Sequence, residues 1–120
     1  MTPKANPVDF SSPASRAVLI RKLYHELENR NHGGSWTTQE DMIGFMSDVG
    51  ELGRLLMASE GRWVHDGDLP KDLGDKLAEC MWWIFVLSDR LGIDISQAFS
   101  RKMDELDASL SAGIEKPKAG

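Results

Sequence analysis

Acidic side chains recur at helical spacing in two stretches of the sequence. Asp48 and Glu51 are three residues apart, and Asp75 and Glu79 are four residues apart. Side chains three or four positions apart project from the same face of an α-helix. Each pair would therefore present two carboxylates on one side of a helix, and the two acidic faces converge if the helices pack antiparallel at about 8–10 Å.

A convergent group of carboxylates predicts a cation site, because like charges at short range destabilise one another. Mg²⁺ suits such a site, since it binds carboxylate oxygens and keeps positions open for water and substrate phosphates, and Mn²⁺ is a possible substitute. Such a metal polarises a phosphoryl oxygen and activates water. Two simpler interpretations stay open, a solvated acidic helix face and pairing of the carboxylates with Arg or Lys.

The segment 72–94 is the element that must position the second acidic pair. It opens with carboxylates, continues through the apolar residues 80–87 and stops at Gly92. The apolar run is far shorter than the roughly 20 residues that span a bilayer, so it predicts a helix buried on most sides. We expect a second subunit to cover its surplus apolar surface, because closed homo-oligomers are the commonest assemblies.

Three further helices are predicted around this segment, and no strand pattern occurs. The first covers about residues 15–29; the second runs over 37–59 from a capping box of Thr37 and Glu40; the last starts at Asp94 and Gln97. The predicted fold class is all-α, a four-helix bundle. Residues 1–12 are expected to form a flexible arm, 13–112 the helical domain and 113–120 a flexible tail.

Two stripes of the second helix differ in character. One is apolar, and the other holds Asp41, Gly44, Asp48 and Glu51. The helix also contains Gly50 and Gly53, and each helical glycine costs about 1 kcal/mol relative to alanine. Three glycines in one helix indicate close backbone approach to a neighbour or room for a ligand.

Composition limits the partners of the chain. A net charge of −5 and a pI near 5.1 provide no basic field for a nucleic acid polymer or an anionic membrane. The one cysteine, Cys80, lies in the apolar run and is interpreted as a small buried hydrophobe. The N-terminal residues contain no apolar leader, so the expectation is a cytoplasmic protein.

The segments SDVGELGRLLM (47–57) and GDKLAECMWWIFVLSDRLGID (74–94) resemble the MazG-like nucleotide pyrophosphohydrolases. The likeness extends over about residues 23–106, and VGEL and DRLGID are its most specific parts. The resemblance implies an all-α fold akin to that of dimeric dUTPases and dCTP pyrophosphatases. It also implies that carboxylates in ExxE and ExxD motifs bind Mg²⁺, and that a nucleoside triphosphate is hydrolysed to its monophosphate and pyrophosphate.

Carried over to this chain, the resemblance places Asp48, Glu51 and Glu79 at three of the four metal-binding positions. Lys76 stands where the fourth, a glutamate, is expected, and the neighbouring Asp75, or Asp72 one turn earlier, is an alternative ligand. The implied metal ligands are therefore Asp48, Glu51, Asp75 and Glu79. Asp48 and Glu51 are the catalytic candidates, and Glu51 would orient the attacking water.

Three side chains are candidates for substrate binding. Trp36 would stack on a base or, alternatively, close a hydrophobic corner; Lys102 matches a basic residue of the family's last helix; and Lys76 lies close to the expected phosphates. Trp82 and Trp83 are interpreted as core or subunit-interface residues.

Two functions follow from these residues. The first is a metal-dependent (d)NTP pyrophosphohydrolase that cleans the nucleotide pool. The alternative is a MazG-like bundle without catalysis that binds nucleotides or other proteins. The orientation of Lys76 distinguishes them, because an ammonium group inside the site would replace the metal, whereas one that reaches solvent would leave the site open.

Overall fold

The computed structural model describes residues 7–116, which form four α-helices and no strand. These are α1 (Ser11–His32), α2 (Thr38–Ser59), α3 (Leu69–Arg90) and α4 (Ile95–Glu115). The predicted all-α class is thereby confirmed. Within these residues, no helix combines the length and the apolar character needed to cross a membrane.

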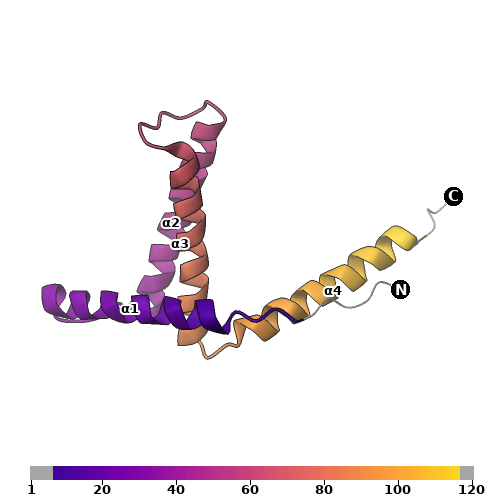
Figure 1. Cartoon of the computed structure of the whole chain (residues 1–120), viewed down its shortest axis with the longest axis horizontal. Helices are drawn as coiled ribbons and strands as arrows, with labels where there is room; N and C mark the ends of the chain where they lie inside the picture. The colour runs from indigo at the N-terminus through magenta and orange to yellow at the C-terminus, as the bar shows by residue number, and fades with distance from the viewer. Residues whose placement is uncertain (1–6, 117–120) are drawn as a thin grey trace.

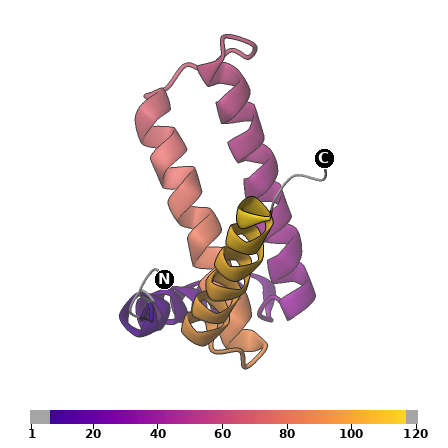
Figure 2. The same ribbon diagram turned by 90° about the vertical axis from the view of Figure 1, so that its right-hand side faces the viewer.

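Helices α2 and α3 form an antiparallel hairpin, and α1 lies across its base (Figure 1). Helix α4 leaves the same base and projects away from the hairpin, as the view turned by 90° also shows (Figure 2). The chain is consequently elongated, with extents of 64 × 40 × 23 Å. Three helices pack together, and the fourth is an arm.

The predicted signals for the ends of the helices occur in the structure. The Glu40 amide donates to Thr37 Oγ1 at 3.2 Å, and the Thr37 amide donates to Glu40 Oε1 at 3.0 Å, which completes the capping box. At the start of α4, Asp94 accepts a hydrogen bond from the Gln97 amide. Gly92 follows α3 with a φ of 67°, the left-handed conformation that glycine adopts without strain.

The first helix begins at Ser11, earlier than the periodicity predicts. Ahead of it, the Phe10 ring packs edge-on against Phe85 at 5.8 Å and Phe99 at 5.4 Å between ring centroids. The Phe10 amide also donates to Ser96 Oγ at 2.7 Å. Residues 7–12, expected in a flexible arm, are thus anchored to α3 and α4. The rest of that arm, 1–6, and residues 117–120 of the expected tail lie outside the described residues.

A buried ionic network joins the three packed helices. Asp41 of α2 is 0% exposed and accepts hydrogen bonds from Arg21 of α1 at 2.7 Å and from Arg90 of α3 at 2.6 Å. Arg21 also pairs with Glu28 at 2.7 Å, and Glu28 accepts the Trp36 amide at 2.7 Å. A single carboxylate therefore connects α1, α2 and α3, and through Glu28 it also positions the α1–α2 connection.

The apolar core of one chain is small. Among the described residues, the buried hydrophobic side chains are Ala17, Trp83, Phe85 and Val86. Trp83 is thus a core residue, one of the two roles expected for it. Trp82 is half-buried and donates its indole N–H to the Ala17 carbonyl at 3.0 Å. Trp82 and Phe85 contact α1 and the segment before it, and Trp83 contacts α2, so the uncovered apolar surface of α3 lies elsewhere.

The network predicts a large loss of stability in the variant Asp41→Asn. The buried Arg21 guanidinium and the partly buried Arg90 guanidinium would lose their shared counter-charge, and breaking a buried ion pair typically costs about 3–5 kcal/mol. Asp89→Asn removes an exposed carboxylate next to Arg90 and serves as the control, with an expected change within about 0.5 kcal/mol. Urea denaturation followed by circular dichroism measures both, and equal midpoints for the two variants would contradict the prediction.

Candidate functional site

The side chain of Lys76 points into the acidic cluster that the sequence predicts. Its Nζ lies 2.7 Å from Glu51 Oε2, 2.9 Å from Glu79 Oε2 and 3.2 Å from Asp48 Oδ1. Asp48 and Glu51 come from α2, whereas Lys76 and Glu79 come from α3. The two acidic faces therefore converge, and an ammonium group occupies the point where their oxygens meet.

The carboxylates hold Lys76 in its charged form. Burial lowers the pKa of Lys76, but the hydrogen bonds that its ammonium group donates to Glu51, Glu79 and Asp48 outweigh the burial and raise the pKa above its usual value. The Lys76 side chain is only 15% exposed, whereas Glu51 and Glu79 are 56% and 51% exposed. The cation is thus shielded, while two of its three partners remain in contact with water.

Asp48 has a second partner that fixes its orientation. The Trp83 indole N–H donates to Asp48 Oδ2 at 2.6 Å, while Oδ1 faces Lys76. Because Trp83 is buried, this carboxylate is held by the core. Glu51 lacks such a support among the contacts of the described residues and is the more exposed acid, at 56% against 20% for Asp48. Of the two catalytic candidates, Asp48 is suited to a role that needs a carboxylate in a fixed position. Glu51 is suited to a role in which the carboxylate changes position.

Asp75 does not join the cluster. Its carboxylate pairs with Lys71 at 2.7 Å on an exposed part of α3. Among residues 7–116, no group of three or more His, Cys, Asp or Glu side chains is arranged to hold a metal ion. Three carboxylates from facing helices have the hard oxygens that Mg²⁺ prefers, but Lys76 Nζ lies between them. Mg²⁺ therefore fits this donor set only after the lysine side chain turns away.

An aromatic cavity of about 440 Å³ opens on one side of the cluster. Tyr24, Trp36, Trp82 and Trp83 contribute its aromatic lining, and Asp48 and Glu79 also lie on its wall. The Trp36 backbone is fixed on both sides, since its carbonyl accepts from Arg90 at 2.9 Å and its amide donates to Glu28. A flat ring could be bound here beside the carboxylates.

A second cavity, of about 400 Å³, lies on the other side of the cluster, toward the α2–α3 loop. It is lined by Glu51, Lys76 and Glu79, together with basic and aromatic groups, Arg54, His65 and Trp63. The Arg54 guanidinium lies 5.7 Å from the centre of the Trp63 ring. The two cavities share Glu79, so the cluster separates an aromatic space from a charged one.

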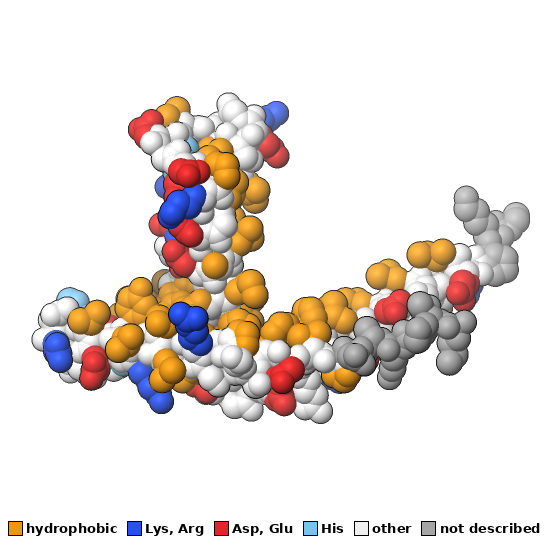
Figure 3. All heavy atoms as spheres, in the orientation of Figure 1, with side chains coloured by type: hydrophobic (Ala, Val, Ile, Leu, Met, Phe, Trp, Pro, Cys, Tyr) orange, Lys and Arg blue, Asp and Glu red, His pale blue; other side chains and the backbone are white. Residues whose placement is uncertain are grey.

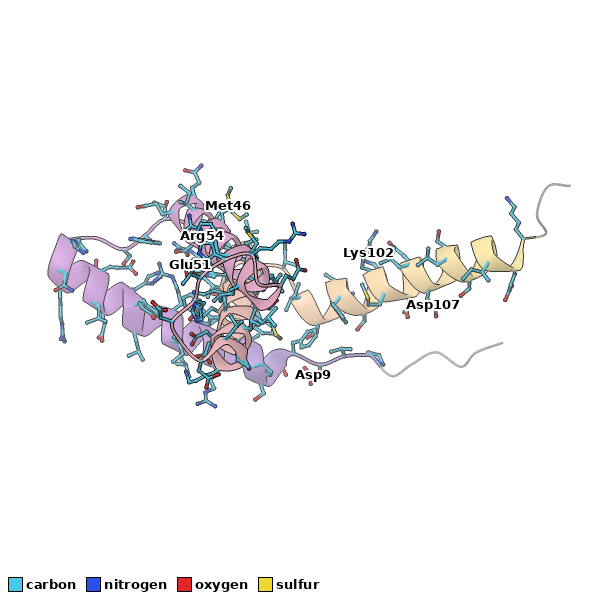
Figure 4. All side chains as sticks on the ribbon, turned by 90° about the horizontal axis from the view of Figure 1, so that it is seen from above. Asp9, Met46, Glu51, Arg54, Lys102 and Asp107 are labelled. Carbon is cyan, nitrogen blue, oxygen red and sulfur yellow. The ribbon has the colours of Figure 1, made fainter. Side chains whose placement is uncertain are left out.

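Lys102, expected to bind substrate, is remote from the cluster in a single chain. It lies on α4 and approaches Glu105 at 3.7 Å. Figure 4 shows it far along the α4 arm from Glu51 and Arg54. The other two candidates, Trp36 and Lys76, do line the cavities beside the carboxylates.

Sequence reasoning missed the ionic network that supports the aromatic cavity. Asp41 shares the stripe of Asp48 and Glu51, but the residue pattern does not indicate its partners Arg21 and Arg90. Arg90 lies within the DRLGID segment, and its contact with the Trp36 carbonyl links that motif to the cavity. The position of Asp41 on that acidic stripe was the available signal, but its burial, which requires a cation nearby, follows only from the packed helices.

Comparison of the chain with protein-family models, with curated proteins and with solved structures gives no match. The functional assignment therefore rests on the geometry of the site and on the motifs in the sequence.

Gly44 predicts a steric test of the aromatic cavity. A Cβ at this position would lie 2.8 Å from Trp83 Cη2 and 3.1 Å from Trp36 Cζ3. Alanine favours a helix by about 1 kcal/mol over glycine, but displacing packed rings costs about 1–3 kcal/mol, so Gly44→Ala should destabilise the protein. At Gly74, also helical, a Cβ meets no atom within 4 Å, and Gly74→Ala should raise the melting temperature. Stabilisation by both substitutions would show that the rings do not require Gly44.

Proposed function

We propose that the chain is a cytoplasmic, metal-dependent nucleoside triphosphate pyrophosphohydrolase built on a homo-oligomeric MazG-type bundle. Its reaction would be (d)NTP plus water giving (d)NMP and pyrophosphate, with the removal of unwanted nucleotides as its role. The observation that carries the proposal is the convergence of Asp48, Glu51 and Glu79 on one cation. Mg²⁺, or Mn²⁺ in its place, would shield the charge of the phosphate chain and polarise its oxygens.

The charge of the cluster favours exchange of Lys76 for a divalent ion. Three carboxylates and one ammonium group leave two negative charges unbalanced. Exposed ion pairs contribute only about 0–1 kcal/mol each, and both Glu51 and Glu79 are about half exposed. Turning a flexible lysine out of the cluster therefore costs little, whereas a triphosphate brings further negative charge that requires a cation.

The two cavities suit the two ends of a nucleotide. A base would stack in the aromatic cavity, where Trp36 forms part of the wall. The phosphates would extend past the carboxylates toward Arg54, and a displaced Lys76 would pair with them there. Asp48 and Glu79 would hold the metal. Glu51, which lacks the support that Trp83 gives Asp48, is the group we assign to orienting the attacking water.

The proposal predicts pyrophosphate release from a panel of canonical and modified nucleoside triphosphates in the presence of Mg²⁺ or Mn²⁺. Glu51→Gln keeps the size of the side chain but removes its charge and basicity, and should lower kcat at least about 100-fold, the usual contribution of a general base. Glu26→Gln, an exposed change on α1, is the matched control and should keep full activity. Equal turnover in the two variants would exclude Glu51 from the reaction, and no turnover of any nucleotide by the folded wild type would reject the enzyme.

A second candidate function is a bundle without catalysis, which acts as a binding or interaction module. The specific observation in its favour is the depth and number of the contacts of Lys76, a shielded ammonium paired with three carboxylates. An ammonium fixed at this point would supply internally the positive charge that a metal supplies in an enzyme.

Thermal unfolding with and without Mg²⁺ separates the two candidates. A ligand that binds only the native state stabilises it by about 1.4 kcal/mol at ten times its Kd, so Mg²⁺ should raise the Tm of an enzyme-type wild-type site. In a module with a fixed lysine, Mg²⁺ should leave the wild type unchanged and raise the Tm of Lys76→Gln alone. Sodium chloride at matched ionic strength corrects for screening, and Glu51→Gln should weaken either response.

A further inference from the structure

The aromatic cavity offers ring surface to a ligand, while two of its N–H donors are already engaged. Trp82 donates its indole N–H to the Ala17 carbonyl at 3.0 Å, and Trp83 donates its indole N–H to Asp48 at 2.6 Å. What these two residues can still present to a molecule in the cavity is the π-electron surface of their rings, whose faces carry partial negative charge.

The rings of this cavity are inclined to one another. The Tyr24 and Trp82 rings make an angle of 54° at 5.5 Å between centroids, and the Trp82 and Trp83 rings make an angle of 61° at 4.6 Å. Trp36 adds a further indole to the lining. Rings in several orientations line a cavity on more than one side, as they do in the aromatic cages that bind organic cations.

The ionised groups on the wall of the cavity are mainly carboxylates. Glu28, Asp48 and Glu79 contribute negative charge, and Arg21 is the one lysine or arginine among the described residues that line it. Arg21 already pairs with Glu28 and Asp41, so its charge is balanced within the protein. Figure 3 shows charged side chains along one edge of the hairpin, above α1, and hydrophobic side chains where the hairpin meets α1. This lining favours a ligand group that carries positive charge.

The cations of the acidic cluster do not remove this preference. With Lys76 in place, the three carboxylates of the cluster keep two negative charges unbalanced. With one divalent ion in place of Lys76, one negative charge remains, and a bound triphosphate adds more. A positively charged base in the adjacent cavity would therefore still be stabilised by the charges around it.

Nucleobases become cationic near neutral pH when certain ring nitrogens are alkylated, as at N1 of adenine. The charge spreads over a flat ring whose shape changes little. Such a base is attracted to indole faces more strongly than the neutral base, because a cation interacts with the ring quadrupole. The cavity volume of about 440 Å³ lies within the range of small-molecule sites.

We infer that the aromatic cavity selects N-alkylated, positively charged nucleobases, and that the substrates of the proposed hydrolase are nucleoside triphosphates with alkylated bases. The aromatic rings would contact the cationic base, and the carboxylates would supply the negative field around it. The assignment of the substrate rests on the proposed function. The charge preference of the cavity concerns binding alone and can be measured without turnover.

Two isomeric nucleotides isolate the effect of charge on binding. 1-Methyl-AMP carries a cationic adenine at neutral pH, whereas N6-methyl-AMP carries the same methyl group on a neutral adenine. Isothermal titration calorimetry of the full chain should give a Kd about 10-fold lower for 1-methyl-AMP, an effect between those of exposed and desolvated cation–π contacts. Equal affinities for the two isomers, or no binding of either, would overturn the inference.

The double variant Tyr24→Leu/Trp36→Leu tests the contribution of the rings. The two residues are 51% and 40% exposed, and leucine keeps an apolar side chain without π electrons. The ratio of the two Kd values should fall to about 1. Trp63→Leu makes the same change in the charged cavity and should keep the wild-type ratio. A ratio that persists in the double variant, or that falls equally in Trp63→Leu, would contradict the assignment.

Turnover separates this inference from the proposed activity. With Mg²⁺, kcat/KM for 1-methyl-ATP should exceed that for N6-methyl-ATP by a similar factor, about 10-fold. Hydrolysis of both at equal kcat/KM would overturn the inference but leave the enzyme in place. A preference in binding without hydrolysis of any nucleotide would reject the enzyme and the substrate assignment, and would keep the charge preference of the cavity.

Discussion

The arrangement of the helices depends on one buried carboxylate. Asp41 has no contact with water and is neutralised by Arg21 from α1 and Arg90 from α3. An unpaired buried charge is costly. The packing of each of these three helices is therefore favourable only when the other two are in place. The same cations extend to Glu28 and to the Trp36 carbonyl, so the network also shapes the aromatic cavity. With so few buried apolar side chains, this polar constraint specifies how the helices meet.

The acidic cluster around Lys76 differs from the Asp41 site in both net charge and burial. Its carboxylates outnumber its cation, and two of them remain in contact with solvent. Burial and pairing are nearly complete at Asp41, which makes that site a structural one, whereas the Lys76 cluster is partly open and retains excess negative charge. Two acidic sites on one face of α2 thus differ in role because their surroundings differ, although their sequence spacing is alike.

Local sequence signals predicted the helices and the pairing of acidic faces. Capping at Thr37 and the break at Gly92 act within one turn, so residue types alone define them. The convergence of Asp48 with Glu79 also followed, because helical periodicity and antiparallel packing leave few alternatives. The tertiary partners of side chains were harder to predict from the sequence. Periodicity places Asp75 near the cluster, yet Asp75 pairs with Lys71, one turn earlier on α3. The projection of α4 was not predictable either, since a helix's apolar stripe does not specify which chain covers it.

The positions of the tryptophans have a spectroscopic consequence. Trp36, Trp82 and Trp83 line the aromatic cavity, and Trp63, the remaining one of four, lines the charged cavity. Every indole in the chain is therefore adjacent to one of the two spaces beside the carboxylates. Intrinsic fluorescence of this protein should report the polarity and occupancy of those spaces more directly than the general state of the fold, and a bound aromatic base would quench it without any added label.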